Sequence, residues 1–141
     1  MADKVQPVDD PRRPLLNGVA AFEISTDAPE AVEHFYGELF GWVFSPGHGN
    51  PYSIIRTPSE KSAYGGLWDN RVNEKAFNWA IICIQVEDVE QACAKAVEAG
   101  GKVVSPPEKS TGPDGTIFAH LHDPSGNQIG IFSRPVQTPP S

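Results

Sequence analysis

Three side chains in apolar, strand-like segments could move protons. Glu23 lies in the segment Val19 to Ser25, and His120 and His122 lie in the segment Thr116 to His122. Imidazoles and carboxylates are the usual general acids and bases of enzymes. Glu23 points either into a cleft or to solvent at a sheet edge, and we favour the cleft.

The two histidines stand two residues apart, so in a strand their side chains share one face. That spacing can also hold a metal ion, but no third ligand accompanies the pair. We therefore favour a hydrogen bond to a ligand, or proton transfer, as the role of one of them.

The chain has two cysteines, Cys83 and Cys93. They are too few and too internal for a disulfide framework, which predicts a reduced, cytoplasmic protein. Cys83 lies in a predicted strand, where a cysteine is more often a small apolar side chain than a nucleophile. The spacing places no base beside it to activate the thiol.

The composition favours one acidic globular domain. The chain has 141 residues, a net charge of −7 and no basic run longer than Arg12-Arg13. Nucleic acids and anionic membranes bind clustered Lys and Arg, so neither is an expected partner. No apolar run is long enough to span a bilayer and no charged-then-apolar leader is seen, so we expect a protein that is neither membrane-bound nor secreted.

The segment Gly112 to Phe132 predicts a hairpin. Two runs that alternate with a period of two, Thr116 to His122 and Gln128 to Phe132, flank the sequence Asp-Pro-Ser-Gly-Asn. Asp123-Pro124 opens a turn, and Gly126 suits a position with positive φ.

The same order of elements occurs twice along the chain. Each copy has a strand, then a helix with a predicted capping box (Asp27 with Glu30, Asp88 with Gln91), then three strands. Gly41 and Gly100-Gly101 are expected to end the helices. In the first helix Phe35, Tyr36 and Phe40 recur at helical spacing, which predicts that they belong to the core.

The expected strands share alternating or continuous apolar patterns. They are Val19 to Ser25, Trp42 to Ser45, Tyr52 to Thr57, Ala63 to Trp68, Asn78 to Val86, Lys102 to Val104, Thr116 to His122 and Gln128 to Phe132. We expect one domain over residues 17–133, with modules of about 18–70 and 76–133. Residues 1–16 and 134–141, which lack periodicity, are expected to be flexible.

Short motifs within this order resemble the vicinal oxygen chelate superfamily, which includes glyoxalases, bleomycin-resistance proteins and extradiol dioxygenases. The motifs are Phe35-Tyr36, the sequence LFGW from Leu39 to Trp42, and the DPxGN turn. The resemblance covers Gly18 to Phe132. It implies an α+β fold in which two paired βαβββ modules form a curved mixed sheet around a cleft. It also implies a homodimer.

The resemblance also locates the family's four metal ligands, one each on the first, fourth, fifth and eighth strands. Those positions fall at Ala21, at Gly65 or Gly66, near Ile81, and at Gly130. None of these side chains can coordinate a divalent ion. We therefore expect neither a metal nor another cofactor.

With these positions as markers, strand alternation predicts which side chains face the cleft. The candidate catalytic residues are Glu23, His120 and His122. The candidate ligand-binding residues are Tyr64, Trp68, Trp79, Cys83, Gln85, Phe118, Gln128 and Phe132. Aromatic walls with a few polar groups suit a planar or polycyclic organic ligand.

Three functions follow from this cleft. We favour a metal-free protein of the bleomycin-resistance kind that binds a small aromatic metabolite. The alternative is a metal-independent isomerase, lyase or cyclase of a secondary metabolite that uses Glu23 with His120 or His122. A metal-dependent glyoxalase-like enzyme ranks third because its ligands are missing.

Overall fold

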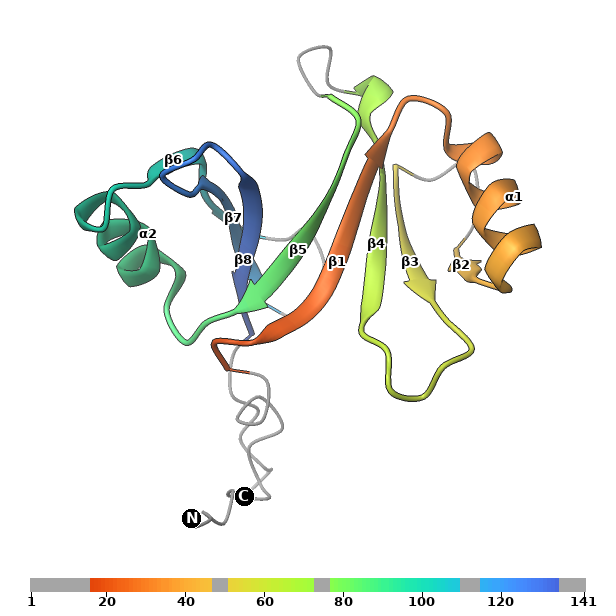
Figure 1. The fold of residues 1–141 in the computed structure, drawn as a ribbon, viewed down its shortest axis with the longest axis horizontal. Coiled ribbons are helices and arrows are strands. Elements are labelled where there is room, and N and C mark those ends of the chain that lie inside the picture. The colour runs from red at the N-terminus through yellow and green to blue at the C-terminus, as the bar shows by residue number, and fades with distance from the viewer. Residues whose placement is uncertain (1–15, 47–50, 73–76, 110–114, 135–141) are drawn as a thin grey trace, which may run out of the picture. The chain divides into compact units, whose positions relative to one another are not determined.

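The computed structural model describes residues 16–46, 51–72, 77–109 and 115–134. They form two compact units (Figure 1). The first unit is residues 20–82, and the second is residues 83–134 together with residues 16–19. The arms expected to be flexible lie outside the described residues, except for Leu16 and Arg134. The predicted domain bounds stay a prediction.

The first unit is a βαβββ module. Its elements are β1 (Val19–Thr26), α1 (Pro29–Phe40), β2 (Val43–Ser45), β3 (Tyr52–Arg56), β4 (Tyr64–Asp69) and the short 3₁₀ helix η2 (Asn70–Val72), followed by the start of β5 (Trp79–Gln85). The strands are ordered β2-β3-β4-β1. β1 and β4 are parallel, and the other pairs are antiparallel.

The core of the first unit lies between its sheet and α1. Ile24, Ile55 and Leu67 are buried there, and Val32 and Tyr36 of the helix pack against them. Ile55 is fully buried. Burial of the apolar side chains of α1 holds the helix on one face of the sheet. The helix does not cover the opposite face.

The prediction that Phe35 and Phe40 belong to the core is wrong, because 54% and 51% of their surfaces are exposed. Tyr36 makes the inward contact instead, with its ring stacked on Trp42 at 4.7 Å between centroids. Phe35 meets Tyr36 edge-on at 5.0 Å, on the outside of this stack. More apolar side chains lie along α1 than can contact the sheet.

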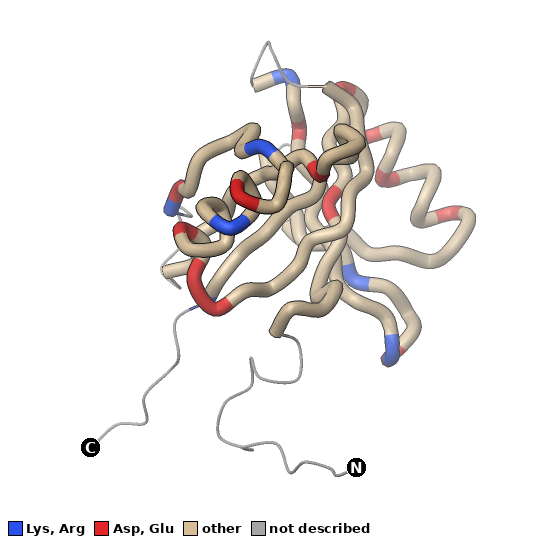
Figure 2. The backbone as a smooth tube through the Cα atoms, turned by 60° about the vertical axis from the view of Figure 1, so that its left-hand side comes forward, with Lys and Arg blue, Asp and Glu red and all other residues tan. Residues whose placement is uncertain are grey.

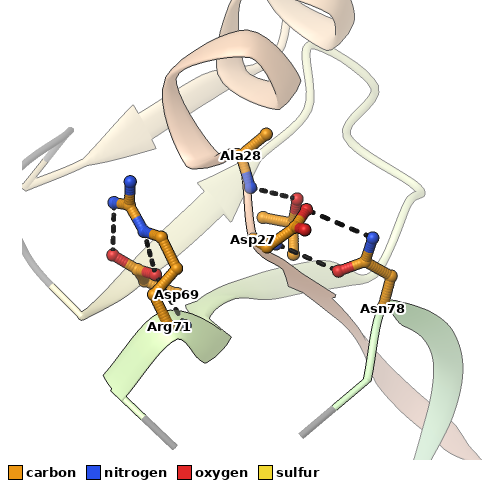
Figure 3. A network of polar contacts seen from close by, with 6 residues as sticks. Asp27, Ala28, Asp69, Arg71 and Asn78 are labelled. Atoms are coloured by element: carbon orange, nitrogen blue, oxygen red, sulfur yellow. Dashed lines mark hydrogen bonds and ion pairs between the residues drawn. The ribbon is translucent and has the colours of Figure 1, made fainter. Parts of the chain in front are cut away.

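The predicted capping box of α1 is also wrong. The N-cap residue is Ala28, with no side-chain cap, and its N–H donates to Thr26 Oγ1 at 2.9 Å. Asp27 is engaged elsewhere: its N–H donates to Asn78 Oδ1 at 3.0 Å, and Asn78 Nδ2 donates to Asp27 Oδ1 at 3.3 Å (Figure 3). A contact 51 residues away in sequence has displaced the local one.

A buried amide connects this network to β1. Asn70 Nδ2 donates to Ser25 Oγ at 3.0 Å and to Asn78 Oδ1 at 2.9 Å. Beside it, Arg71 pairs with Asp69 at 2.7 Å (Figure 3). The hydrogen bond from Arg71 lowers the pKa of Asp69, although so exposed a pair adds little stability. The buried amide uses both N–H donors of Nδ2 in these bonds and so ties the residue before β5 to β1.

The second unit repeats the pattern with the end of β5. It continues with α2 (Val89–Glu98), β6 (Lys102–Lys109), β7 (Ile117–His122) and β8 (Gln128–Ser133), and its strands are ordered β5-β8-β7-β6. β5 and β8 are parallel, and the other pairs are antiparallel. The α+β class and the two βαβββ modules are therefore confirmed. In the described part of the chain, no helix is long and apolar enough to cross a bilayer.

The core of the second unit lies between its sheet and α2. It contains Val86, Val89, Cys93, Ala119, Leu121 and Ile131. The predicted cap at Asp88 is confirmed, since its side chain accepts a hydrogen bond from the Gln91 N–H at 3.0 Å. β6 runs five residues past its predicted end at Val104, through two prolines. An outer strand tolerates proline, and its register with β7 shifts there.

The predicted DPxGN turn forms around the Asp123 carboxylate. Oδ1 accepts from the Ser125 N–H at 2.8 Å and from the Asn127 N–H at 2.9 Å. The Asn127 side chain donates to Oδ2 at 2.9 Å, and Gly126 has a φ of 91° as expected. The Asn127 side-chain hydrogen bond is the main cause that lowers the pKa of Asp123.

Asp123→Asn should therefore lower the melting temperature at pH 7. The carboxylate accepts hydrogen bonds with both of its oxygens, whereas the amide has only one acceptor oxygen. A lowered pKa stabilises the fold above the usual carboxyl pKa of about 4, and this stabilisation is lost as the pH falls through the lowered value. The difference from wild type should therefore shrink below about pH 4 in thermal denaturation. Ser125→Ala, which keeps all three hydrogen bonds, is the matched control. A difference that did not change with pH would exclude this role for the carboxylate.

Candidate functional site

Each unit has one sheet face that its helix does not cover. In the first unit, β1 and β4 pair Ala21 with Tyr64, Glu23 with Gly66, and Ser25 with Trp68. β3 brings Tyr52 opposite Trp68. Paired residues point to the same side of a sheet. Glu23, Tyr52, Tyr64, Gly66 and Trp68 therefore share one face, which we name the first-unit face.

Two adjacent glycines on β4 distinguish the helix-covered face of the sheet from the first-unit face. A Cβ at Gly65 would lie 2.4 Å from the Phe22 ring, which packs with the helix-side core. A Cβ at Gly66 would lie 1.8 Å from the Tyr52 hydroxyl. Each glycine thus makes room for an aromatic ring, one on each side of the sheet. The predicted grouping of Tyr64, Gly66 and Trp68 follows this alternation.

A carboxylate and a phenol meet on the first-unit face. The hydroxyl of Tyr52 lies over Gly66, and Gly66 pairs with Glu23, whose side chain is half-buried. The Tyr52 and Trp68 rings lie 6.3 Å apart at 51°. Sequence reasoning missed Tyr52. The signal was its position at the head of β3, which antiparallel pairing places opposite Trp68.

The second-unit face holds the other predicted residues. Cys83 and His120 both pair with Gly130, Phe118 pairs with Phe132, and His122 pairs with Gln128. Gln85 pairs with Phe132 and is 2% exposed. Ala119, Leu121 and Ile131 point to the helix side, so the predicted alternation of β7 is observed.

Gly130 is the centre of the second-unit face. A Cβ there would lie 3.0 Å from Cys83 Sγ and 3.6 Å from His120 Cδ2. The ring of His120 lies 6.4 Å from that of Phe118, edge-on. The structure therefore brings a thiol, an imidazole and a phenyl ring together.

The other predicted site residues are divided between the two units. Trp79 is half-buried at the start of β5 and belongs to the first unit. Glu23 lies in the first unit, whereas His120 and His122 lie in the second. The predicted acid–base pairing of Glu23 with a histidine stays a prediction.

The residues at the four family metal positions do not fit a divalent ion. The side chains of Ala21, Gly65 or Gly66, Ile81 and Gly130 offer no ligand atom, and the space at Gly66 holds the Tyr52 hydroxyl. Among the described residues, no three His, Cys, Asp or Glu side chains are grouped as a metal site requires. The side chains on these faces are of types that can make aromatic contacts, form hydrogen bonds and transfer protons.

Two shallow hollows mark the surface. One, of about 180 Å³, is lined by Arg56, Tyr64 and the residues between β3 and β4, at the margin of the first-unit face. The other, of about 350 Å³, is lined by Glu87, Asp88, Ile117 and neighbours, beside the start of α2. Ile117 packs on the helix-side core, so this second hollow is not part of the second-unit face.

A family model described as a glyoxalase-like domain matches residues 21–132. The chain belongs to this family. A glyoxylase-like domain-containing protein of Didymella fabae is 30% identical over 129 residues, which cover 86% of this chain and 98% of that protein. The match therefore spans almost the whole of that relative.

Solved structures share the fold of the glyoxalase-like domain. A methylmalonyl-CoA epimerase from Mycobacterium tuberculosis matches with a TM-score of 0.60 and 15% identity, over 84% of this chain and 89% of that one. A glyoxalase/bleomycin resistance protein/dioxygenase superfamily member from Vibrio splendidus matches with a TM-score of 0.57 and 9% identity, over 82% and 97%. The predicted superfamily is confirmed.

Proposed function

We propose that this glyoxalase-like domain binds a small aromatic or polycyclic metabolite without a metal ion, and that the first-unit face is its binding surface. The observation that carries this is the aromatic pair Tyr52–Trp68 beside the half-buried Glu23, on the side of the sheet away from the helix. Apolar rings with a few fixed polar groups are typical of ligand sites.

The side chains on this face supply complementary contacts. Tyr52 is 40% exposed, so its ring is available to a planar partner. Stacked or edge-on ring pairs contribute about 0.5–1.5 kcal/mol beyond burial. Glu23 can accept a hydrogen bond from a hydroxyl or amine on the ligand and so orient it.

A panel of planar aromatic metabolites, read by thermal shift and titration, tests the proposal. A ligand at about 100 times its Kd should stabilise the domain by about 2.7 kcal/mol. The shift should be the same with EDTA and with added Mn²⁺ or Zn²⁺. A shift that requires the metal would contradict metal-free binding.

Trp68→Ala should weaken binding of such a ligand about fivefold, because one ring contact is lost. Phe77→Ala is the matched control: that ring is also aromatic and is 75% exposed, but it lies outside the strands of the first-unit face. Titration should show the wild-type Kd for the control. Equal losses in both variants would place the ligand elsewhere.

A metal-independent isomerase or lyase is the second candidate. It is favoured because the Tyr52 hydroxyl lies above Gly66, and Gly66 pairs with Glu23. Glu23 would remove a proton from carbon, and Tyr52 would donate to the oxygen that becomes negative. Exchange of solvent deuterium into a bound ketone, lost in Glu23→Gln, is the diagnostic measurement. The acid–base roles predicted for His120 and His122 stay predictions.

The domain is also proposed to form a homodimer. Support comes from exposed apolar side chains on α1 and β2, where Phe35, Leu39, Phe40 and Val43 are each more than half exposed. So many exposed apolar residues are unusual on a monomer. Light scattering at micromolar concentration should give twice the 15.2 kDa chain mass. A single-chain mass throughout would contradict it.

Neither nucleic acid nor membrane is a proposed partner. The Lys and Arg residues of the described chain stand apart from one another (Figure 2), and the net charge is −7. Polyanions bind clustered cations, which this distribution does not offer.

A further inference from the structure

Two cysteines with the same exposure have different surroundings. Cys83 is 8% exposed and Cys93 is 7% exposed. Cys93 lies on the buried side of α2 among apolar side chains, and burial, with a smaller effect of the nearby Glu90, raises the pKa of its thiol. Cys83 instead lies on the second-unit face against Gly130, with His120 on the other side of that glycine.

We propose that Cys83 and His120 form a nucleophilic pair that captures a planar α,β-unsaturated carbonyl compound as a thioether. Sγ of Cys83 and Cδ2 of His120 both lie within 3.6 Å of the point where a Gly130 Cβ would stand. Cδ2 is bonded to Nε2, so the basic nitrogen belongs to the same edge of the ring. A thiol beside an imidazole is the arrangement that activates cysteine nucleophiles.

The lack of a side chain at residue 130 is what permits this approach. A methyl group there would stand 3.0 Å from the sulfur, closer than ordinary van der Waals contact. Phe118 and Phe132 pair directly across β7 and β8 on the same face. Their rings suit a conjugated, planar electrophile over a small aliphatic one.

The reaction balances without an oxidant or a second substrate. The thiol proton passes to His120 Nε2 as Sγ bonds to the β-carbon of the electrophile. The π electrons of the C=C bond move toward the carbonyl and form an enolate. The imidazolium then returns the proton to the α-carbon, which leaves a saturated thioether and a neutral histidine.

The test is alkylation of the full-length chain with N-phenylmaleimide, a planar α,β-unsaturated carbonyl compound. Intact mass and peptide mapping over time separate the two cysteines. Cys83 should react at least fivefold faster than Cys93. His120→Gln and Gly130→Ala should each slow the reaction of Cys83 severalfold and leave that of Cys93 unchanged.

Cys93 also reports on the folding of each variant, because loosening of the core would raise its rate. If His120→Gln loosens the fold, the proposal is tested by two other results. They are the ratio of the Cys83 and Cys93 alkylation rates in the wild-type chain and the Cys83 rate in Gly130→Ala. Equal rates for the two cysteines, no reaction at either, or variants that keep the wild-type Cys83 rate would each overturn the pair. Capture at Cys83 is independent of binding at the first-unit face, so either can fail alone.

Discussion

Glu23→Gln should lower the affinity for an aromatic ligand, or the turnover of a substrate, at least tenfold, which corresponds to about 1.4 kcal/mol. Glutamine keeps the size of the side chain but removes its charge and its basicity. Glu23 pairs with Gly66, over which the Tyr52 hydroxyl lies, so the loss falls at the centre of the first-unit face. Isothermal titration and steady-state assays measure it.

Glu38→Gln is the matched control for this change, since Glu38 is exposed on α1. Both variants should melt close to the wild-type temperature, because neither alters the buried core. If Glu23→Gln binds as wild type does, Glu23 only faces solvent, and the aromatic side chains alone determine binding.

Gly65 and Gly66 are neighbours on β4, but their substitution by alanine should have different effects. Gly65→Ala should lower the stability of the fold, and Gly66→Ala should lower the affinity for a ligand. The added methyl at Gly65 meets the Phe22 ring at 2.4 Å, and Phe22 is held by Trp42 at 5.3 Å between ring centroids. Overpacking of a core costs about 1–3 kcal/mol, so Gly65→Ala should destabilise the fold by this amount. Urea denaturation measures the change.

Gly66→Ala should spare stability and impair binding. Its methyl meets the Tyr52 ring, which is 40% exposed and can swing into solvent. The variant should therefore lose affinity through displacement of Tyr52, with a free energy of unfolding near wild type. Equal destabilisation by both substitutions would mean that Tyr52 is as fixed as Phe22, and that the two faces of β4 are equally part of the core.

Sequence patterns predicted the elements because hydrophobic periodicity and turn residues act locally. Gly41 ends α1 in a left-handed conformation, Asp88 caps α2, and Asp123 organises its turn, each through contacts within a few residues. The failures involved distant partners. Asp27 bonds to Asn78 and so cannot cap α1, and Tyr36 takes the inward position that periodicity gave equally to Phe35 and Phe40.

The same distinction applies to the candidate site. Alternation along a strand predicted which residues share the face with His120 and Gly130. It could not predict that Tyr52 reaches over Gly66, or that Cys83 and His120 flank Gly130, because both depend on the register between strands. Register is set by pairing across the sheet, which a single sequence shows only weakly.

The filled space at Gly66 limits which side chains this surface can accept. A carboxylate introduced at that position would collide with the Tyr52 hydroxyl, so one substitution there would damage the present surface before it created a metal ligand. Gly130 is similarly constrained by Cys83. A metal-binding side chain at residue 66 would therefore also require a replacement of Tyr52. The two residues act as a unit in any redesign of this surface, and neither can be exchanged alone.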